Sequence, residues 1–311
     1  MRRFRWFVLG GAASLAAYWL ARYLRPEHSP LVLNQAVVIV TGASSGIGRA
    51  YALAFARRGA RVVLAARRAA LLEEVRAEIA TYAADVLCLP TDLNDDAQLE
   101  RLVQTTLEHY GRIDILINNA GIALQGLLQN HDPSRVREMV SLNLAAAINL
   151  TRLCLPAMLR QGSGVILNVS SVGGKVPNAT APAYAATKVG LNAFSDALRR
   201  QLEGTGVRVV TVLPSYVDTE MLSPLVQDYV RDLGFTIDTP QYVAEHTIDE
   251  LLKGEQEIWF GGFAVRAFAW LERHLPFFST LLQRALITPE VIALTEGRLA
   301  AAQADPQGAP Q

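Results

Sequence analysis

From residue 36 onward, short apolar runs alternate with longer segments of helical hydrophobic periodicity. Because few polar residues interrupt the runs, the strands they predict are expected to be parallel and covered on both faces. Asp132-Pro133 and Thr239-Pro240 have the capping residue followed by proline that begins helices. The alternation predicts an α/β fold with a doubly wound parallel sheet. The predicted strands are Val37–Val40, Arg61–Ala65, Val86–Leu89, Ile113–Ile117, Val165–Val169 and Val207–Leu213, with a helix at Asp95–Tyr110.

The domain organisation follows from where this pattern starts and stops. We expect an N-terminal hydrophobic segment over residues 1–30, a single domain over 34–262, and a C-terminal helical extension with a polar tail over 263–311. Residues 264–286 are apolar and aromatic, and Pro276 divides them into two short helices. These helices could pack on the domain, join a second subunit, form a lid or contact a membrane, and the sequence leaves these alternatives open.

Composition and charge exclude several classes of protein. The 311 residues are 51% hydrophobic and 19% charged, which excludes a disordered or low-complexity chain. Lys+Arg and Asp+Glu are both 29, but five arginines and no acid fall in residues 1–25, so the remainder is acidic and argues against a nucleic-acid partner. The two cysteines, Cys88 and Cys154, predict buried thiols and neither a disulfide framework nor a metal site.

A glycine-rich turn follows the first predicted strand and precedes a helix over Arg49–Arg58. Glycines allow a tight turn close to a pyrophosphate, and a helix N-terminus offers free N–H groups with positive potential. Such a turn can also be purely structural, but its place on the first strand of an alternating sheet favours dinucleotide binding. The residues expected to bind are Gly42, Ser44, Ser45, Gly46, Ile47 and Gly48.

The ends of the next strands suggest which dinucleotide binds. The second strand ends at Ala66, where a carboxylate would hold the ribose of NAD, and Arg67 follows. An arginine there favours NADP(H) over NAD(H), although Arg67 and Arg68 could also begin a solvated helix. The adenosine half is expected to lie against the residues that follow the third and fourth strands: Asp92, Leu93, Asn119, Ala120 and Gly121.

Tyr184 and Lys188 are four residues apart on a predicted helix and therefore share one face. A nearby ammonium is expected to lower the pKa of the phenol and make it a proton donor or acceptor near neutrality. Ser171 follows the fifth strand, where its hydroxyl could bind a substrate oxygen, and Asn143 lies in the long helix after Pro133. An isolated mid-helix asparagine is more often a surface residue.

Together, Thr41–Gly48, Asn118–Gly121, Asn143, Ser171 and the Tyr184/Lys188 pair resemble the short-chain dehydrogenase/reductase family over about residues 34–260. The resemblance implies a Rossmann-like sheet of about seven strands and subunits that form dimers or tetramers. It also implies that Tyr184 is the general acid/base, that Ser171 holds the substrate oxygen, and that Lys188 holds the nicotinamide ribose. Asn143 would position a water that links Lys188 to solvent.

Two stretches depart from the family pattern. After the sixth strand, the family's Pro-Gly is Pro214-Ser215 here, which affects the geometry of the loop. Pro214, Val217 and Thr219 remain as expected cofactor contacts, with Thr219 near the nicotinamide amide. The glycine-rich end typical of the family is replaced by Phe260–Gly262 and about fifty further residues.

The N-terminal segment is predicted to associate with a membrane. Trp6–Ala21 carries no charge, and its length of about 24 Å as a helix falls short of a ~30 Å hydrocarbon core unless flanking residues contribute. A signal peptide and a buried helix are the alternatives. Three arginines before the segment and two after it favour a cytoplasmic N-terminus. A nicotinamide-dependent domain is expected in the cytoplasm, so the sequence leaves the orientation open.

Apolar residues flank the predicted active site, and Lys175, the one basic residue among them, is expected to face solvent. The sequence therefore predicts an NADP(H)-dependent oxidoreductase that interconverts a ketone or aldehyde with an alcohol on a lipophilic substrate, such as a long-chain acyl, sphingoid, retinoid or steroid-like compound. The alternatives are a non-catalytic nucleotide-binding membrane scaffold or sensor, and a reaction without net redox change. The flanking residues are Ile122, Ala123, Leu124, Val172, Val176, Tyr216, Val217, Met221, Leu222 and Leu225.

Overall fold

The computed structural model describes residues 31–82, 84–222, 224–232, 234–286 and 292–293. The chain divides into two units, Met1–Leu31 and Val32–Gln311. The expected N-terminal anchor at residues 1–30 and the polar tail from residue 294 onward lie outside the described residues. The second unit contains the predicted sheet and its helices.

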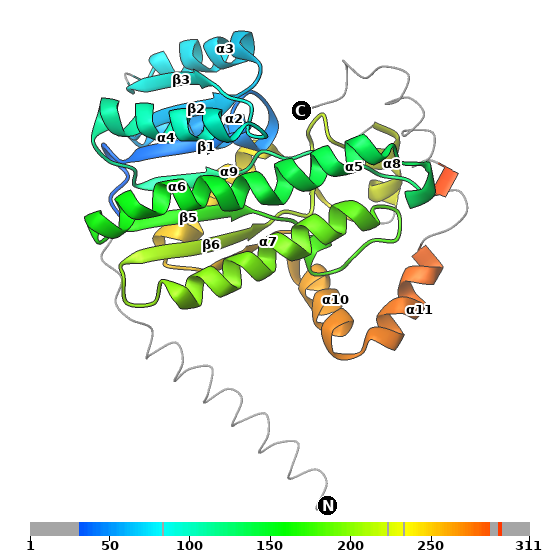
Figure 1. Cartoon of the computed structure of the whole chain (residues 1–311). Helices are drawn as coiled ribbons and strands as arrows, with labels where there is room; N and C mark the ends of the chain where they lie inside the picture. Colours follow the sequence, from blue (N-terminus) through cyan, green and yellow to red (C-terminus); the bar gives the residue numbers. More distant parts are fainter. Residues whose placement is uncertain (1–30, 83, 223, 233, 287–291, 294–311) are drawn as a thin grey trace, which may run out of the picture. The chain divides into compact units, whose positions relative to one another are not determined.

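A seven-stranded sheet forms the centre of the second unit, with the strand order β3-β2-β1-β4-β5-β6-β9 (Figure 1). Every neighbouring pair in this sheet is parallel, so the predicted doubly wound α/β fold is confirmed. The strands are β1 (Val37–Thr41), β2 (Arg61–Ala66), β3 (Val86–Pro90), β4 (Ile115–Asn118), β5 (Gly164–Val169), β6 (Val207–Leu213) and β9 (Glu257–Trp259).

The six predicted strands are present, and none of their ends differs from the prediction by more than two residues. The largest difference is at β4, which starts two residues later than the apolar run, directly after Asp114. Its carboxylate accepts hydrogen bonds from the Val37 N–H and from Arg112. The three-residue strand β9 is too short for its periodicity to predict it. A separate two-stranded sheet pairs β7 (Tyr216–Val217) with β8 (Ile237–Asp238).

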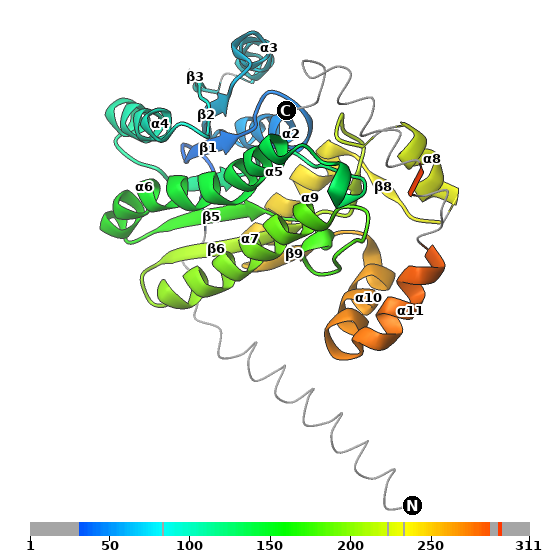
Figure 2. The ribbon, with the colours of Figure 1, turned by 45° about the vertical axis from the view of Figure 1, so that its right-hand side comes forward.

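Helices cover both faces of the sheet (Figures 1 and 2). One layer contains α4, α6 and α7, and the other contains α2, α3 and α9. The segment between α5 and α6 is the π-helical turn η2 (Ser141–Ala145). The helices are α2 (Gly46–Arg57), α3 (Ala69–Ala80), α4 (Asp96–Tyr110), α5 (Pro133–Val140), α6 (Ala146–Gln161), α7 (Pro182–Gln201), α8 (Pro224–Asp232), α9 (Pro240–Leu252), α10 (Gly262–His274) and α11 (Pro276–Leu286).

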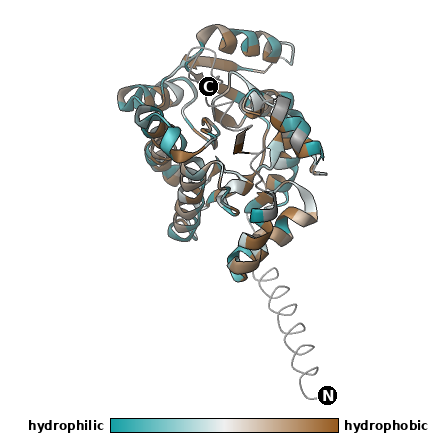
Figure 3. Ribbon diagram, turned by 90° about the vertical axis from the view of Figure 1, so that its right-hand side faces the viewer, coloured by the Kyte–Doolittle hydropathy of each residue, from teal (hydrophilic) through white to brown (hydrophobic). Residues whose placement is uncertain are grey.

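Three predicted helix starts are confirmed by their caps, whereas α2 begins at Gly46, three residues before the predicted Arg49. The side chains of Asp95, Asp132 and Thr239 accept hydrogen bonds from the first free N–H groups of α4, α5 and α9. Gly111 ends α4 in the left-handed region, with φ of 72°. In Figure 3, hydrophobic and hydrophilic residues alternate along the outer helices, as expected for helices that bury one face on a sheet.

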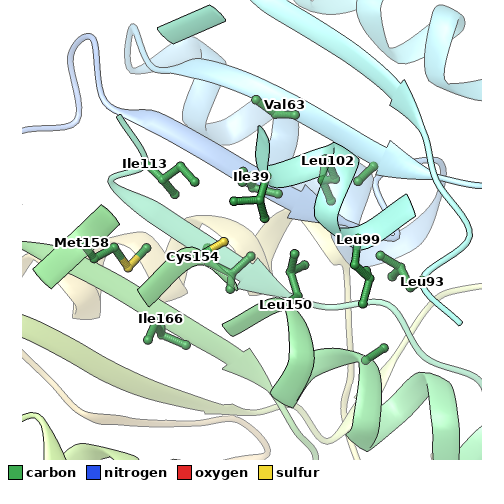
Figure 4. Close-up of a cluster of buried hydrophobic side chains, with 14 of the residues drawn as sticks. Ile39, Val63, Leu93, Leu99, Leu102, Ile113, Leu150, Cys154, Met158 and Ile166 are labelled. Atoms are coloured by element: carbon green, nitrogen blue, oxygen red, sulfur yellow. The ribbon is translucent and has the colours of Figure 1, made fainter. Parts of the chain in front are cut away.

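The main hydrophobic core lies between the sheet and the helices α4 and α6 (Figure 4). Ile39 and Val63 enter it from neighbouring strands, and Leu99 and Leu150 enter it from the helices. Each of these side chains is almost fully buried, so the core fixes how the helices sit on the strands. The packed core therefore holds the sheet, and with it the ends of its strands, in a fixed position.

Cys154 is buried and Cys88 is half-buried, and both are free thiols. Within the described ranges, one helical stretch is long and apolar enough to cross a membrane, at Pro133–Gln161, and it comprises α5, η2 and α6. Leu150, Cys154 and Met158 of α6 are buried in the core against the sheet. This stretch has the position of a core helix.

Candidate active site

A cavity of about 710 Å³ opens along the carboxyl ends of the parallel strands. This is the edge where open α/β sheets bind ligands, and the strand order changes direction there between β1 and β4. All but two of the predicted site residues line the cavity. Gly48 and Asn143 lie behind its wall. The lining residues are Gly42, Ser44, Ser45, Gly46, Ile47, Arg67, Asp92, Leu93, Asn119, Ala120, Gly121, Ser171, Tyr184, Lys188, Pro214, Val217 and Thr219.

The glycine turn brings the backbone of β1 and the start of α2 close together. Gly42 and Gly46 have φ of 65° and 53°, in the region that favours glycine. A Cβ atom at Gly48 would lie 2.1 Å from the Gly42 carbonyl oxygen, so only glycine fits there. Ser45, the N-cap of α2, makes no side-chain capping hydrogen bond. The first N–H groups of the helix therefore remain available to an anionic ligand.

Thr41 and Asn119 join the ends of β1 and β4 beneath the turn. The Thr41 Oγ1 atom accepts hydrogen bonds from the N–H groups of Asn119 and Ala120, at 2.9 and 3.1 Å. It donates to the Ile117 carbonyl at 2.9 Å, and the Asn119 side-chain amide donates to the Thr41 carbonyl at 2.9 Å. Sequence reasoning assigned no role to Thr41, although a hydroxyl that ends a buried strand needs such partners.

Two arginines stand at the end of β2. Arg67 is exposed and forms an ion pair with Glu138 at 3.6 Å. Arg68 is half-buried and lies across the glycine turn. Its guanidinium donates to the hydroxyls of Ser44 and Ser45 at 3.0 and 2.8 Å. The alternative of a solvated helix start does not hold for Arg68, because the two serine hydroxyls hold its side chain over the cavity, which it lines.

Ser171 and Tyr184 come together from β5 and α7. Ser171 lies two residues after the end of the strand, and its hydroxyl accepts a hydrogen bond from the Gly173 N–H at 3.0 Å. Tyr184 lies in the first turn of α7, where Pro182 begins the helix. Burial raises the pKa of the Tyr184 phenol, and a hydrogen bond with the Ser171 side chain acts in the opposite direction. The two hydroxyls are thus placed to bind one substrate oxygen.

Lys188 lies one turn further along α7 and is 5% exposed. Its Nζ atom donates to the Val169 carbonyl at 3.0 Å and lies 5.6 Å from the centroid of the Tyr184 ring. Burial lowers the pKa of Lys188 to about 8. We expected this ammonium to lower the pKa of Tyr184. In the structure the pKa of the phenol is raised instead, because desolvation of the buried phenol has the largest effect.

Asn143 occupies the π-helical segment η2, not a regular α-helix as expected. Its Oδ1 atom accepts a hydrogen bond from the Ile122 N–H at 2.9 Å, and its Nδ2 atom donates to the Ile122 carbonyl at 2.8 Å. It also donates to the Thr187 hydroxyl at 3.2 Å. Asn143 therefore fixes the loop after β4 to α7. The water-positioning role implied by the family stays a prediction.

The substrate half of the cavity is mainly apolar. Ala123, Val172, Val176, Tyr216, Val217, Met221 and Leu222 line it as expected, whereas Ile122 and Leu124 do not, and the side chain of Leu225 lies outside the described residues. Sequence reasoning missed a second group, which lies on α10, on α11 and before β8, because periodicity does not show where an appended helix packs. This group contains Phe235, Ala264, Val265, Phe268, Leu282 and Gln283.

Two residues near this half differ from their expected settings. Lys175, expected to face solvent, is half-buried and pairs with the Glu257 carboxylate at 2.5 Å. Glu257 lies on β9, the strand that the sequence did not predict. Ser215 replaces the family's glycine and lies against Gly261, whose added Cβ would be 3.1 Å from the serine hydroxyl oxygen. The loop therefore accommodates Ser215 because glycine stands opposite it.

Comparisons with known proteins agree with this geometry. A family model described as short chain dehydrogenase matches residues 36–230. The Anopheles gambiae protein named Dehydrogenase/reductase SDR family protein 7-like is 35% identical over 268 residues, which are 82% of this chain and 84% of that protein. The residues matched by the family model contain strands β1 to β6, the glycine turn, and Ser171, Tyr184 and Lys188.

Two solved structures extend the similarity to the cofactor. A metagenomic short-chain oxidoreductase in complex with NADP is 31% identical, with a TM-score of 0.64, and the match covers 74% of this chain and 98% of that one. The 3-ketoacyl-(acyl-carrier-protein) reductase from Brucella melitensis, complexed with NADH, is 30% identical, with a TM-score of 0.64 and coverage of 70% and 90%. From its matching family model, its relatives and the dinucleotide-binding turn of its sheet, we conclude that the chain belongs to the short-chain dehydrogenase/reductase family and is an NAD(P)-dependent oxidoreductase.

Proposed function

We propose that this protein uses NADP(H) to interconvert a carbonyl group and an alcohol on a lipophilic substrate, with Tyr184 as the general acid/base. The proposal rests on one observation. Ser171, Tyr184 and Lys188 line the same cavity as the glycine turn and the two arginines at the end of β2. A nicotinamide cofactor supplies or accepts a hydride when it is bound there. The protein's own residues bind the dinucleotide, orient the substrate and move the proton.

The residues of the cavity fit a dinucleotide. The glycine turn leaves the start of α2 open to the pyrophosphate. The turn needs glycine at position 48, because a side chain there would overlap the Gly42 carbonyl oxygen. Asp92 and Asn119 line the part of the cavity beside β3 and β4 that would take the adenosine half. Thr219 lines the opposite part, beyond β6, where the nicotinamide amide would lie.

NADP(H) is favoured over NAD(H) by the charge at the end of β2. Ala66 offers no carboxylate to a ribose hydroxyl, and Arg67 and Arg68 both line the cavity beside it. A 2′-phosphate carries about two negative charges, which guanidinium groups and serine hydroxyls bind well. Arg68 lies across Ser44 and Ser45, so three donors already converge at this point.

The proton chemistry belongs to Ser171, Tyr184 and Lys188. In the reductive direction, the Tyr184 hydroxyl would donate its proton to the carbonyl oxygen, which Ser171 holds by a hydrogen bond. The Lys188 ammonium, 5.6 Å from the phenol ring, would stabilise the phenolate that remains. Burial raises the pKa of the free phenol, so this stabilisation is needed for turnover near neutrality.

The walls of the substrate half favour a lipophilic molecule. Val176, Met221, Phe235 and Phe268 give it apolar surface, and the lining contains no basic residue besides Arg67, Arg68 and Lys188 in the described part of the chain. The Brucella relative is a 3-ketoacyl reductase, and an acyl chain would suit these walls. Long-chain acyl, sphingoid, retinoid and steroid-like ketones all fit this description.

We also propose that residues 1–25 associate the protein with a membrane and that the catalytic domain lies in the cytoplasm, where reduced nicotinamide cofactor is available. The uncharged run Trp6–Ala21 between arginines supports the association. Fractionation of the full chain and of a chain that lacks residues 1–25 tests it. The full chain should sediment with membranes and resist extraction by salt, whereas the shortened chain should stay in the supernatant. Equal distribution of the two chains would refute the association.

Arg67→Ala should weaken NADPH binding much more than NADH binding, since only NADPH carries the phosphate that Arg67 would contact. Loss of one charge-assisted hydrogen bond predicts a decrease in NADPH affinity of about tenfold to a hundredfold. Titration of cofactor fluorescence measures both affinities, and Arg101→Ala, at an exposed arginine of α4, is the matched control. Equal losses for both cofactors would count against the phosphate contact.

Tyr184→Phe removes only the hydroxyl and should lower turnover of a ketone by about a hundredfold to ten-thousandfold. NADPH binding should be retained, because the phenol ring stays in the wall of the cavity. The consumption of NADPH, followed by its absorbance, measures turnover. Tyr216→Phe removes the other tyrosine hydroxyl of the cavity lining and should leave most of the activity. Full activity of the Tyr184→Phe variant would eliminate the proposed mechanism.

Lys188→Met tests the buried ammonium through the pH dependence of stability. Burial lowers the pKa of Lys188 to about 8, and an unfolded lysine titrates near 10.4. The unfolded chain therefore binds more protons between these pH values, so Lys188 makes the free energy of unfolding rise with pH there. Relative to the variant, the free energy of unfolding of the wild type should rise by about 1 kcal/mol per pH unit in this window, as measured by urea denaturation.

The control for this measurement is Lys253→Met, at an exposed lysine, and its stability should follow the wild type across the same window within a few tenths of a kcal/mol. Parallel curves for the wild type and the Lys188→Met variant would show that Lys188 keeps an ordinary pKa in the folded protein.

A further inference from the structure

The helices α10 and α11 form a hairpin that exposes several large apolar side chains. We call the following residues the hairpin face: Phe263, Trp270, Phe277, Phe278 and Leu281, with exposed fractions of 86%, 58%, 74%, 53% and 56%. Single apolar residues are normal on a protein surface, but five large exposed ones on two adjacent helices indicate a place of interaction. Figures 1 and 2 show the two helices as the outermost elements at this end of the sheet.

The hairpin face is distinct from the side of the hairpin that packs on the domain. On α10, Val265 and Ala269 are buried and Phe268 lines the cavity. The exposed residues Phe263 and Trp270 are seven positions apart and so lie on one stripe of the helix. On α11, Leu282 and Gln283 reach the cavity. The hairpin therefore forms a wall of the cavity with one side and leaves an aromatic side uncovered.

Charge decides which partner fits the hairpin face. Arg266, Arg273 and Arg284 are exposed on the two helices. Glu272 is the single acid of residues 262–286, and its carboxylate is half-buried and turned into the hairpin. It accepts hydrogen bonds from the Ser279 hydroxyl and, at 3.2 Å, from the Gln283 side-chain amide. The exposed side of the hairpin therefore carries aromatic and cationic side chains, whereas the carboxylate of Glu272 is bonded within the hairpin.

We propose that the hairpin face docks on a lipid bilayer that contains anionic headgroups, and that the substrate passes from this bilayer into the cavity. The aromatic side chains would enter the headgroup region, where Trp and Phe are favoured, and the arginines would contact the phosphates. A two-fold contact between two copies would instead set the same arginines against one another. The passage of substrate rests on the proposed function, whereas the docking does not.

Docking can be measured on the full chain with a polarity-sensitive fluorophore attached at Phe277→Cys. In vesicles of phosphatidylcholine with phosphatidylserine, the emission should shift to shorter wavelength and become protected from an aqueous quencher. Gln104→Cys, at an exposed position of α4, is the matched control and should show neither change. Wild-type protein treated with the same reagent gives the background from Cys88 and Cys154.

The role of charge is tested by reversing the three arginines of the hairpin together. The variant with Arg266→Glu, Arg273→Glu and Arg284→Glu should lose most of the shift and protection at position 277. The same reversal at Arg101, Arg152 and Arg160, which are exposed on α4 and α6, should leave both intact. Identical signals at positions 277 and 104, or a shift that needs no vesicles and grows with protein concentration, would overturn the proposal, the latter in favour of a second copy.

Turnover separates this proposal from the proposed function. The hairpin-reversed variant should reduce a long-chain ketone dissolved in the vesicles at least about tenfold more slowly than the wild type, and should reduce a short water-soluble ketone at the wild-type rate. Equal loss with both ketones would refute passage from the bilayer. If the wild type reduces neither ketone, the proposed function fails, and the fluorescence measurement still decides whether the hairpin face docks.

Discussion

The hydrogen bonds between Thr41 and Asn119 are the constraint on which the rest of the site depends. They join the ends of β1 and β4, where the strand order reverses and the polar ends of parallel strands must find partners. Because these bonds hold the two strand ends together, the glycine turn can pass close above them, and Gly48 can approach the Gly42 carbonyl. The cavity lies along this edge of the sheet, and the glycine turn and Asn119 form part of its wall.

Burial shifts the protonation of the two residues that we propose to act on the substrate proton. Tyr184 and Lys188 are both removed from water, and burial disfavours the charged form of each, so it raises the pKa of the phenol and lowers the pKa of the ammonium. The two pKa values therefore move apart, because that of the phenol rises from its ordinary value near 10 and that of the ammonium falls to about 8. Both shifts favour the uncharged forms, so the buried phenol keeps its proton, as a proton donor must in the reductive direction.

The C-terminal hairpin connects the cavity with the surface. Phe268 and Leu282 belong to the wall of the substrate half, and the opposite side of the same two helices carries exposed aromatic and arginine side chains. On the proposed function, a substrate of low solubility would gain from such an arrangement, because its path from a lipid phase to the hydroxyls of Ser171 and Tyr184 would not cross bulk water. The appended helices thus complete a cavity whose other walls lie within the shared family fold.

The sequence by itself determined six of the seven strands of the sheet, the capped starts of three helices, and most of the residues that line the cavity, because these features depend on local chemistry: apolar runs, capping residues such as Asp95, glycines in a tight turn, and the Tyr184/Lys188 spacing. Tertiary structure alone decided that Arg68 lies over Ser44 and Ser45, that Lys175 pairs with Glu257, and that α10 and α11 line the cavity. These contacts join residues far apart in the chain, and their geometry depends on how the helices and strands pack, which periodicity and spacing do not encode.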